Sequence, residues 1–436
     1  MRRSRENSKV LGPSLLAAAR SPWSRLAIGS PISRLSRVIR WRRLCAGSAY
    51  ARRVAPVIVV MSLAFAVSAH AAPYMGVDTW YGYGLSVNEQ AVVNLTNATV
   101  DRGLEAAGYR DVWIDAGWWK PADGPGTPGA RNADGSIQLD PSLWPHGMRW
   151  LTDYIHAKGL LAGIYTDAGP VGCGNGGSWS HYQQDSDTFA AWGFDAVKVD
   201  YCGGGRTGMT PEQNFSAFSA ALRASGRAML LNVCNAVHPN GPGDWLTAWQ
   251  FAPPISNAWR TGPDIGWPGV VSWSNVLRNL DLDASHPQAQ SPGHYNDPDY
   301  IVPGESKTLG ESRAQVTMWA MESAPMMISA DLEHLPSQLV ALTTNQSVIA
   351  VDRTDVQARQ VGHSGIWTKP APKGGLYVAL LNRQTTARKM TARSLHQGRH
   401  PVVSNLWTRR ASTSAQANVT VTVPGNSAAL LQVTSH

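Results

Sequence analysis

Between residues 73 and 352 the chain alternates short apolar, β-rich segments with longer amphipathic ones, and this alternation limits the possible folds more than any other feature. The amphipathic segments at 88–107, 146–158, 181–192 and 210–224 predict helices, and a glycine follows each of the last three within two residues. Eight such units in about 280 residues are typical of a closed parallel barrel rather than an open sheet. We therefore predict an α/β protein with a (β/α)8 TIM barrel over residues 73–352. The predicted strands are Tyr74–Trp80, Asp111–Ala116, Leu160–Thr166, Ala196–Tyr201, Ala228–Val233, Asn257–Arg260, Tyr295–Asp299 and Pro325–Ser329.

After Asp352 the pattern changes to short β-rich runs separated by turns rich in Gly, Pro, Asn and Thr. This pattern predicts a small C-terminal antiparallel β domain over residues 353–436. Its predicted strands are Gly362–Lys369, Gly375–Asn382, Ala387–Ala392, Pro401–Trp407 and Asn418–Val423.

The formal net charge of +8 comes from the N-terminal segment. Residues 1–72 hold 13 of the 38 Lys and Arg residues but only one of the 30 acidic residues, Glu6. The remaining chain therefore has 25 basic and 29 acidic residues, a net charge of −4. Because the basic character belongs to this segment, the composition indicates no nucleic-acid partner.

Residues 1–72 are interpreted as a basic extension followed by a signal peptide. Arg52 and Arg53 precede the apolar run Val54–Val67, and Ser68-Ala69-His70-Ala71 follows it with small residues suited to cleavage. We expect cleavage after Ala71 and a secreted or periplasmic product without stable membrane insertion. A retained membrane anchor is the alternative, although the run is shorter than the ~20 residues that a span needs. The first 50 residues are either a disordered extension or the result of a start codon placed too far upstream.

Export permits disulfide bonds. Three cysteines follow the predicted cleavage site, Cys173, Cys202 and Cys234, and they allow one bridge and leave one thiol. No Cys or His pattern has metal-ligand spacing, so we predict no metal site and no cofactor.

Carboxylates recur at the ends of the predicted barrel strands, which is where such barrels carry their active sites. Acids crowded at one rim repel one another, so the pattern favours either a divalent metal or a carbohydrate ligand. Interleaved tryptophans favour a sugar, whose C–H faces stack on aromatic rings. The acids are Asp115, Asp167, Asp200, Asp264, Asp297 and Asp299, and the tryptophans are Trp80, Trp118, Trp119 and Trp259.

Glycoside hydrolysis needs two carboxyl groups, about 5–5.5 Å apart when one attacks the anomeric carbon directly. Asp200 is the predicted nucleophile, because Lys198 lies two residues earlier on the same strand face and favours an ionised carboxylate. Asp264 is the predicted general acid/base, because it follows Arg260 in a loop rich in Gly and Pro.

These motifs resemble glycoside hydrolase family 27, the α-galactosidase and α-N-acetylgalactosaminidase family of clan D. The resemblance covers nearly the whole predicted barrel in one order, and the C-terminal β domain also fits the plan of the family. The matching stretches are Met75–Trp80, Trp144–Met148, Tyr154–Leu160, Gly163–Gly169, Phe189–Asp195, Lys198–Cys202, Trp259-Arg260 and Tyr295–Asp299.

The resemblance implies a double displacement with net retention, in which Asp200 is the nucleophile and Asp264 the acid/base. It also implies a disulfide bond between Cys173 and Cys202, next to the nucleophile. The sugar-binding positions of the family fall on Trp80, Asp115, Tyr165, Lys198 and Arg260.

The chain departs from the family at substrate-reading positions. Family α-galactosidases carry two adjacent aspartates after the second strand, whereas this chain has Asp115-Ala116. Asn235 stands where a Glu often lies near the 2-hydroxyl group, so it is a further candidate for substrate binding. The usual disulfide partner of Cys234 is here Ser256, which implies a free thiol. If the pocket keeps the family's shape, Ala116→Asp is expected to tighten galactose binding by about 1–3 kcal/mol. The alternative is that a neighbouring loop fills the gap left by Ala116, in which case the new carboxylate is buried and unfavourable.

The leading hypothesis is a secreted retaining glycoside hydrolase that removes terminal α-linked galactose from glycans or oligosaccharides. The alternatives are the same mechanism on an α-N-acetylgalactosaminide, a β-L-arabinopyranoside or an isomaltose-type α-glucoside, and a non-catalytic glycan-binding barrel. For the β domain, carbohydrate binding and simple coverage of the barrel both remain open.

Overall fold

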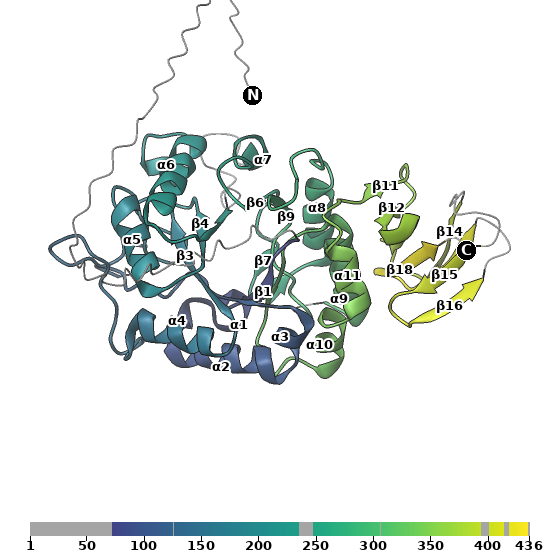
Figure 1. The fold of residues 1–436 in the computed structure, drawn as a ribbon, viewed down its shortest axis with the longest axis horizontal. Helices are drawn as coiled ribbons and strands as arrows, with labels where there is room; N and C mark the ends of the chain where they lie inside the picture. Colours follow the sequence, from purple (N-terminus) through teal and green to yellow (C-terminus); the bar gives the residue numbers. More distant parts are fainter. Residues whose placement is uncertain are drawn as a thin grey trace, which may run out of the picture. The chain divides into compact units, whose positions relative to one another are not determined.

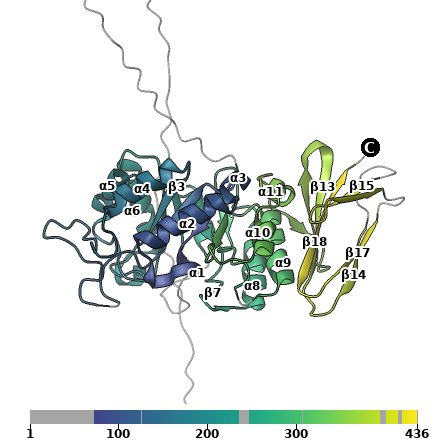
Figure 2. The same ribbon diagram turned by 90° about the horizontal axis from the view of Figure 1, so that it is seen from below.

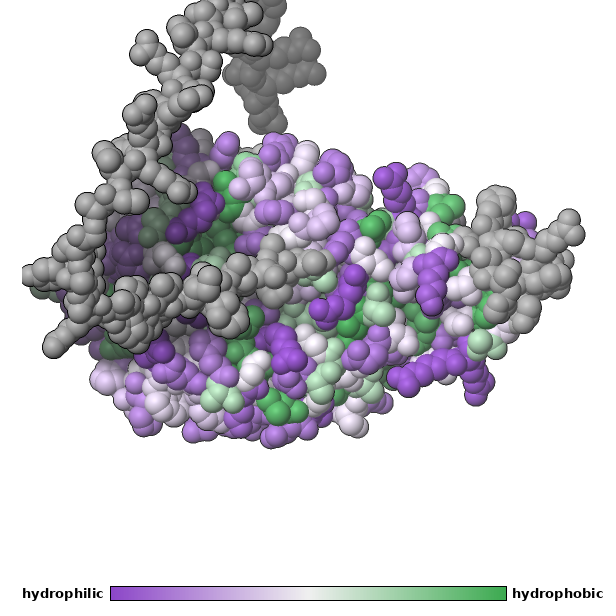
Figure 3. Space-filling model, in the orientation of Figure 1, coloured by the Kyte–Doolittle hydropathy of each residue, from purple (hydrophilic) through white to green (hydrophobic). Residues whose placement is uncertain are grey.

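The computed structural model describes residues 72–124, 126–234, 247–305, 307–393, 401–413 and 418–434. The predicted leader, its cleavage site and Asn235 lie outside these residues. No helix within them is long and apolar enough to cross a membrane. On the face shown in Figure 3, hydrophilic and hydrophobic residues are interspersed over the described surface.

Eight parallel strands form the predicted barrel sheet, in the order β10-β1-β2-β3-β4-β5-β6-β9. The backbone of Ile301, beyond β9, pairs with Ile328 of β10, so the two ends of the sheet meet. All eight predicted strands are confirmed, each to within about two residues at either end. Figure 1 shows helices around these strands. The strands are β1 (Met75–Asp78), β2 (Asp111–Ile114), β3 (Leu161–Asp167), β4 (Ala196–Asp200), β5 (Leu230–Val233), β6 (Ala258–Arg260), β9 (Tyr295–Asp297) and β10 (Met326–Ser329).

Large side chains fill the barrel interior. Trp113 of β2 stacks on Tyr74, with ring centroids 5.3 Å apart, and both residues are buried. Gly163 of β3 lies against the same indole, and a Cβ at this position would come within 2.3 Å of the ring. The glycine therefore makes room for Trp113, and the interior is a packed core rather than a channel.

The helices follow the predicted segments, with one difference. Residues 88–107 form two helices instead of one, because Gly103 has a φ of 76° and turns the chain between α2 and α3. Thr210 begins α6 with a reciprocal capping box to Gln213. The helices are α1 (Trp80–Tyr83), α2 (Glu89–Asp101), α3 (Leu104–Ala107), α4 (Gly147–Ala157), α5 (Tyr182–Trp192), α6 (Pro211–Ala224), α7 (Ala248–Phe251), α8 (Trp273–Asp283), α9 (Leu309–Glu322), α10 (Ser337–Thr343) and α11 (Gln346–Asp352).

The C-terminal region is an antiparallel β domain, as predicted (Figure 2). One sheet has the order β11-β12-β13-β18-β15-β16, and β14 pairs with β17. The central strand β18 is absent from the sequence prediction, as are β11 and β16. The strands are β11 (Arg359–Gln360), β12 (Ile366–Ala371), β13 (Gly375–Asn382), β14 (Arg388–Ala392), β15 (Val402–Asn405), β16 (Arg410–Thr413), β17 (Val419–Val423) and β18 (Ser427–Thr434).

Helix α9 connects the barrel to this domain. It packs against β13 and β18, and the buried residues Trp367 and Leu430 belong to the same apolar core as the barrel. A second, smaller core that includes Val378 and Val423 lies within the β domain. The continuous core makes the first sheet of the β domain part of the structure that supports the barrel.

Candidate active site

A pocket opens at the carboxyl ends of the barrel strands, as the position of the acids predicts. Strands β4 and β6 contribute residues directly, and the segments that follow β1, β2, β3, β6 and β9 complete the wall. The lining residues are Trp80, Tyr81, Asp115, Ala116, Cys173, Lys198, Asp200, Arg260, Asp264, Gly266, Trp267, Asp299 and Tyr300.

Asp200 ends β4 and is only 5% exposed. Its Oδ1 atom is buried and accepts no hydrogen bond from any residue in the described parts of the chain. Lys198 Nζ lies 3.8 Å from this oxygen, and the disulfide-bonded Cys173 Sγ lies 3.2 Å from Oδ2. The carboxylate is therefore fixed beside a positive charge and at the wall of the pocket, as a nucleophile requires.

The pKa of Asp200 is raised by its surroundings. Burial raises it to about 8, and the negative charges of Asp115 and Asp264 act in the same direction, against the opposing charge of Lys198. Burial also raises the pKa of Asp264, where the charge of Asp299 adds to the effect and that of Arg260 opposes it. The surroundings therefore shift both carboxyl groups toward their protonated forms.

Lys198 is the positive centre of a buried network. Its Nζ atom lies 2.7 Å from Asp115 Oδ2, and the hydroxyl group of Tyr300 donates to the same oxygen at 2.6 Å. Tyr300 also contacts Asp78 Oδ2 at 3.2 Å, at the end of β1. Although burial raises the pKa of Asp115, Lys198 and these hydrogen bonds bring it below its usual value. The network keeps Asp115 ionised at the wall of the pocket.

Arg260 connects the predicted acid/base to the barrel. Its Nη2 atom lies 3.2 Å from Asp264 Oδ1 and 2.7 Å from Asp299 Oδ2. Asp299 also accepts a hydrogen bond of 2.7 Å from the backbone N–H of Ile265. Asp299 therefore fixes both the guanidinium group and the loop that carries Asp264. The side chain of Asp264 keeps 35% exposure, so it can exchange protons with the solvent.

A short hairpin of β7 (Gly266–Trp267) and β8 (Val270–Val271) forms one side of the pocket. Trp267 is 55% exposed and lies beside Trp80, with ring centroids 5.6 Å apart. The hydroxyl group of Tyr81 donates to the carbonyl oxygen of Gly266 at 2.6 Å and anchors the hairpin. The sequence analysis does not identify Trp267, since it lies in a loop rather than at a strand end.

Several residues that the sequence analysis assigns to the site lie elsewhere. Tyr165 is buried behind the pocket wall, and its hydroxyl oxygen accepts the backbone N–H of Cys173 at 2.9 Å. Asp167 accepts backbone N–H groups of Gly169 and Cys202, both at 2.6 Å, and so ties together the loops after β3 and β4. Asp167 therefore supports the loops around the pocket rather than lining it.

The tryptophan argument also needs correction. Trp118, Trp119 and Trp259 are buried core residues, and only Trp80 of the four predicted tryptophans lines the pocket. The strand-end rule that finds Asp200 would also have found Asp78, whereas no local signal identifies Tyr300.

The cysteines pair as the resemblance implies. Cys173 and Cys202 form a disulfide bond that joins the loops after β3 and β4, and Cys234 is a buried free thiol. Cys234 Sγ lies 3.5 Å from Arg260 Nη1. Within the described residues, one group of side chains has the spacing of metal ligands, Asp167 with Cys173 and Cys202, and the disulfide bond occupies its two sulfur atoms.

Ala116 lies in a filled corner of the pocket wall. It is 2% exposed, and Gly174 lies so close that a Cβ there would come within 2.8 Å of the Ala116 methyl group. The same Cβ would lie 2.5 Å from Leu85 Cδ2. The loop after β3 therefore occupies space that a longer side chain at position 116 would need.

The chain thus has a (β/α)8 barrel with two carboxyl groups, Asp200 and Asp264, in one pocket at the carboxyl ends of its strands. This is the arrangement of barrel-type glycoside hydrolases. Comparison with known proteins specifies the family. Residues 77–354 match the family described as alpha galactosidase A, and residues 361–433 match the alpha galactosidase C-terminal beta sandwich domain. The chain belongs to this α-galactosidase family, glycoside hydrolase family 27.

Curated relatives agree with this assignment. The chain is 35% identical to alpha-galactosidase A of Cellvibrio japonicus over 72% of its own length and 77% of the relative. It is 33% identical to alpha-galactosidase 2 of Arabidopsis thaliana over 74% and 78% of the two chains.

Solved structures share the fold. Alpha-galactosidase I from Mortierella vinacea has a TM-score of 0.73 and 27% identity, and the match covers 84% of this chain and 98% of that structure. A family 27 β-L-arabinopyranosidase from Geobacillus stearothermophilus has a TM-score of 0.74 over 84% and 98% of the chains. Its identity of 19% supports similarity of fold alone.

Proposed function

We propose that this protein removes terminal α-linked galactose from glycans by double displacement, through a covalent intermediate on Asp200. The observation that carries the proposal is that Asp200, with Lys198 beside it, lines the same pocket as Asp264. The relatives with 30–35% identity, all described as α-galactosidases, support galactose as the sugar.

In the first step the carboxylate of Asp200 attacks the anomeric carbon, and the bond from this carbon to the glycosidic oxygen breaks. Protonated Asp264 gives its proton to the departing oxygen. In the second step Asp264, now a carboxylate, takes a proton from water while the water oxygen displaces Asp200. Two inversions at one carbon give net retention, and both carboxyl groups return to their starting states.

The surroundings of Asp200 and Asp264 favour the protonation states that these steps require. Asp200 must be ionised and Asp264 protonated at the start, and Lys198 favours that distribution because it lies 3.8 Å from Asp200. Asp264 has the greater exposure and the looser setting, which suit the group that exchanges protons.

Sugar recognition is assigned to Trp80, Asp115, Lys198 and Arg260, all of which line the pocket. Ionised Asp115 is an acceptor for sugar hydroxyl groups, and Lys198 is a donor. Tyr165 acts by holding the backbone of Cys173 beside Asp200. Asn235 remains a candidate near the 2-hydroxyl group on the resemblance alone. The signal-peptide pattern supports secretion of this enzyme.

A second candidate substrate is a β-L-arabinopyranoside. This sugar has the ring configuration of galactose but lacks its hydroxymethyl group. Ala116 makes part of the wall apolar where the resemblance expects an acid for the sugar's O4 and O6. A sugar without O6 loses less from that replacement than galactose does.

Hydrolysis of a panel of nitrophenyl glycosides by the chain from Pro73 tests these assignments. We expect the highest kcat/KM on the α-galactoside and a retained product anomer by NMR. A higher kcat/KM on the β-L-arabinopyranoside would make the second candidate the function. Preference for an α-glucoside or an α-N-acetylgalactosaminide, or an inverted product, would contradict the proposal.

A further inference from the structure

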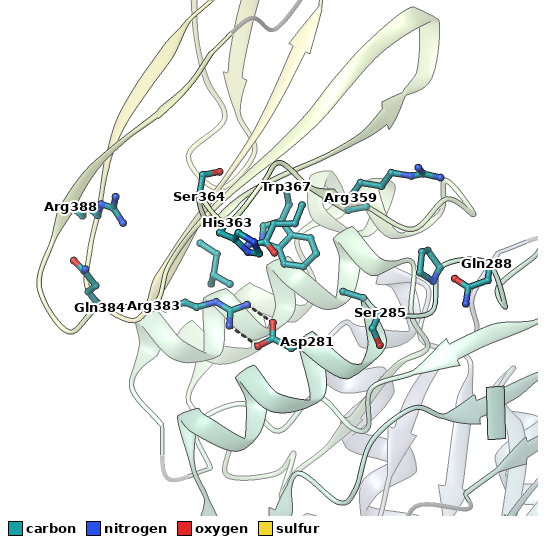
Figure 4. Close-up of a pocket in the computed structure, with 16 residues that line it drawn as sticks. Asp281, Ser285, Gln288, Arg359, His363, Ser364, Trp367, Arg383, Gln384 and Arg388 are labelled. Carbon is teal, nitrogen blue, oxygen red and sulfur yellow. Dashed lines mark hydrogen bonds and ion pairs between the residues drawn. The ribbon is translucent and has the colours of Figure 1, made fainter. Parts of the chain in front are cut away.

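A second cavity, of about 990 Å³, lies outside the active-site pocket, between α8 and strands of the β domain (Figure 4). This volume lies in the range of small-molecule binding sites, about 300–1,000 Å³. Basic and amide side chains supply much of its wall. The residues that carry the argument are Asp281, Arg359, His363, Trp367, Arg383 and Arg388.

The single carboxylate in this wall is already neutralised. Asp281 of α8 receives two hydrogen bonds from the guanidinium group of Arg383, at 2.8 and 2.5 Å. This bidentate ion pair connects α8 to the turn after β13, and Figure 4 marks it with dashed lines. Because both oxygens of Asp281 are occupied, the carboxylate does not compete for cations or donors from a ligand.

Two further guanidinium groups in the wall have no partner. Arg359 of β11 and Arg388 of β14 are exposed and make no ion pair or side-chain hydrogen bond with any described residue. In the view of Figure 4 they lie on opposite sides of Trp367, and His363 lies near the indole. The wall thus carries three arginines against one aspartate, whereas the chain after residue 72 has a net charge of −4. A local excess of positive charge on an acidic protein attracts anions.

Trp367 forms the apolar support of this wall. The residue lines the cavity but is only 2% exposed, and it belongs to the apolar core that the β domain shares with the barrel. Its Nε1–H group is buried and has no acceptor within the described part of the chain. The arginine side chains, rather than the indole, are therefore the groups that a ligand can reach.

We propose that this cavity is a second binding site, for an acidic oligosaccharide whose carboxylate or sulfate groups meet the arginines. Carboxylate and sulfate groups accept hydrogen bonds and donate none, which matches a wall with two guanidinium groups that have no partner among the described residues. Such a site holds the catalytic barrel on an anionic polysaccharide while the active-site pocket removes neutral sugars from it. The binding event is independent of the reaction assigned to Asp200 and Asp264.

Isothermal titration calorimetry on the exported protein tests the site, with trigalacturonic acid as the carboxylate probe and a sulfated galactan trisaccharide as the sulfate probe. Maltotriose is the neutral control. We expect one acidic probe or both to bind, with an affinity that falls as salt rises from 50 to 300 mM. The probe that binds more tightly identifies the anionic group.

The variant Arg359→Gln/Arg388→Gln is expected to weaken binding at least tenfold. The matched control Arg409→Gln/Arg410→Gln removes two exposed arginines of the same domain outside the cavity and is expected to bind like the parent. Thermal unfolding of every variant separates lost binding from lost structure.

Three results overturn the proposal: no binding of either acidic probe to the parent protein, equal binding of maltotriose, or equal losses in the two arginine double variants. Activity on the nitrophenyl α-galactoside is measured in parallel and is expected to be unchanged in all the arginine variants. Failure of the second site therefore leaves the active-site assignment untouched, and the reverse also holds.

Discussion

Ala116→Asp inserts the acid that family α-galactosidases carry at this position, and the structure reverses the effect expected from sequence. From the motif alone, the new carboxylate would gain a hydrogen bond to galactose. In the fold, the methyl group of Ala116 is 2% exposed and packs against the backbone of Gly174, with Leu85 beside it. The longer side chain must therefore displace the loop after β3 or turn into the pocket.

The loss of stability expected for Ala116→Asp is the sum of two effects. Overpacking a close-packed site costs about 1–3 kcal/mol. A buried carboxyl group without donors costs about 1–3 kcal/mol more, since Lys198 is already paired with Asp115 at 2.7 Å. The expected loss of stability is about 2–6 kcal/mol, which lowers Tm by about 3–8 °C for a folded chain of this size. Galactose binding is expected to stay unchanged or to weaken.

Thermal unfolding and the inhibition constant of galactose, measured on both proteins, check this prediction. Ala116→Asn is the matched control, because it has nearly the same shape without the charge. The Asn variant is expected to show the packing loss alone, so the difference between the two variants gives the cost of the carboxyl group. A tenfold lower inhibition constant in Ala116→Asp, with Tm unchanged, would refute the reasoning and show that the corner admits an acid.

Three further predictions concern the catalytic pair and its surroundings. Asp200→Ala is expected to lose turnover and to regain part of it with azide or formate, which enter the cavity as external nucleophiles; near-normal activity without them would contradict the assignment. Asp264→Asn is expected to lose roughly 10²–10⁴-fold on natural galactosides but far less on substrates with acidic leaving groups, and equal losses on both would point to another acid. Asp264→Asn also removes a negative charge that helps raise the pKa of Asp200 to about 8. The acidic limb of the pH profile of kcat/KM is therefore expected to move to lower pH, and the alkaline limb is expected to disappear because Asn does not ionise. Replacing Cys173 and Cys202 together by Ser removes a disulfide bond with a sequence separation of 29. The free energy of unfolding is expected to fall by about 3–4 kcal/mol, and kcat is expected to fall as well. Cys234→Ala, which removes no disulfide bond, is the control for the unfolding and the kinetic measurements.

The barrel was predictable from the sequence because its signals are local. Each strand is a short apolar run buried on both sides, and the glycines that follow helices mark their ends within a few residues. The C-terminal domain was harder to predict. Its central strand β18 pairs with β13 and β15 and is buried along most of its length, so it shows little alternation to separate it from other apolar segments.

The sequence by itself determined the eight-strand order, the β domain and the candidate pair Asp200 and Asp264, since strand ends and motif spacing carry that information. Only the tertiary structure decided which polar and aromatic side chains face the pocket. Asp167 also ends a barrel strand, yet it turns to backbone N–H groups of two loops, while Trp267 reaches the pocket from a hairpin with no strand-end signal. The physical reason is that the direction of a side chain at the barrel rim depends on contacts between loops that are distant in sequence, and each loop is placed by its neighbours rather than by its own residues.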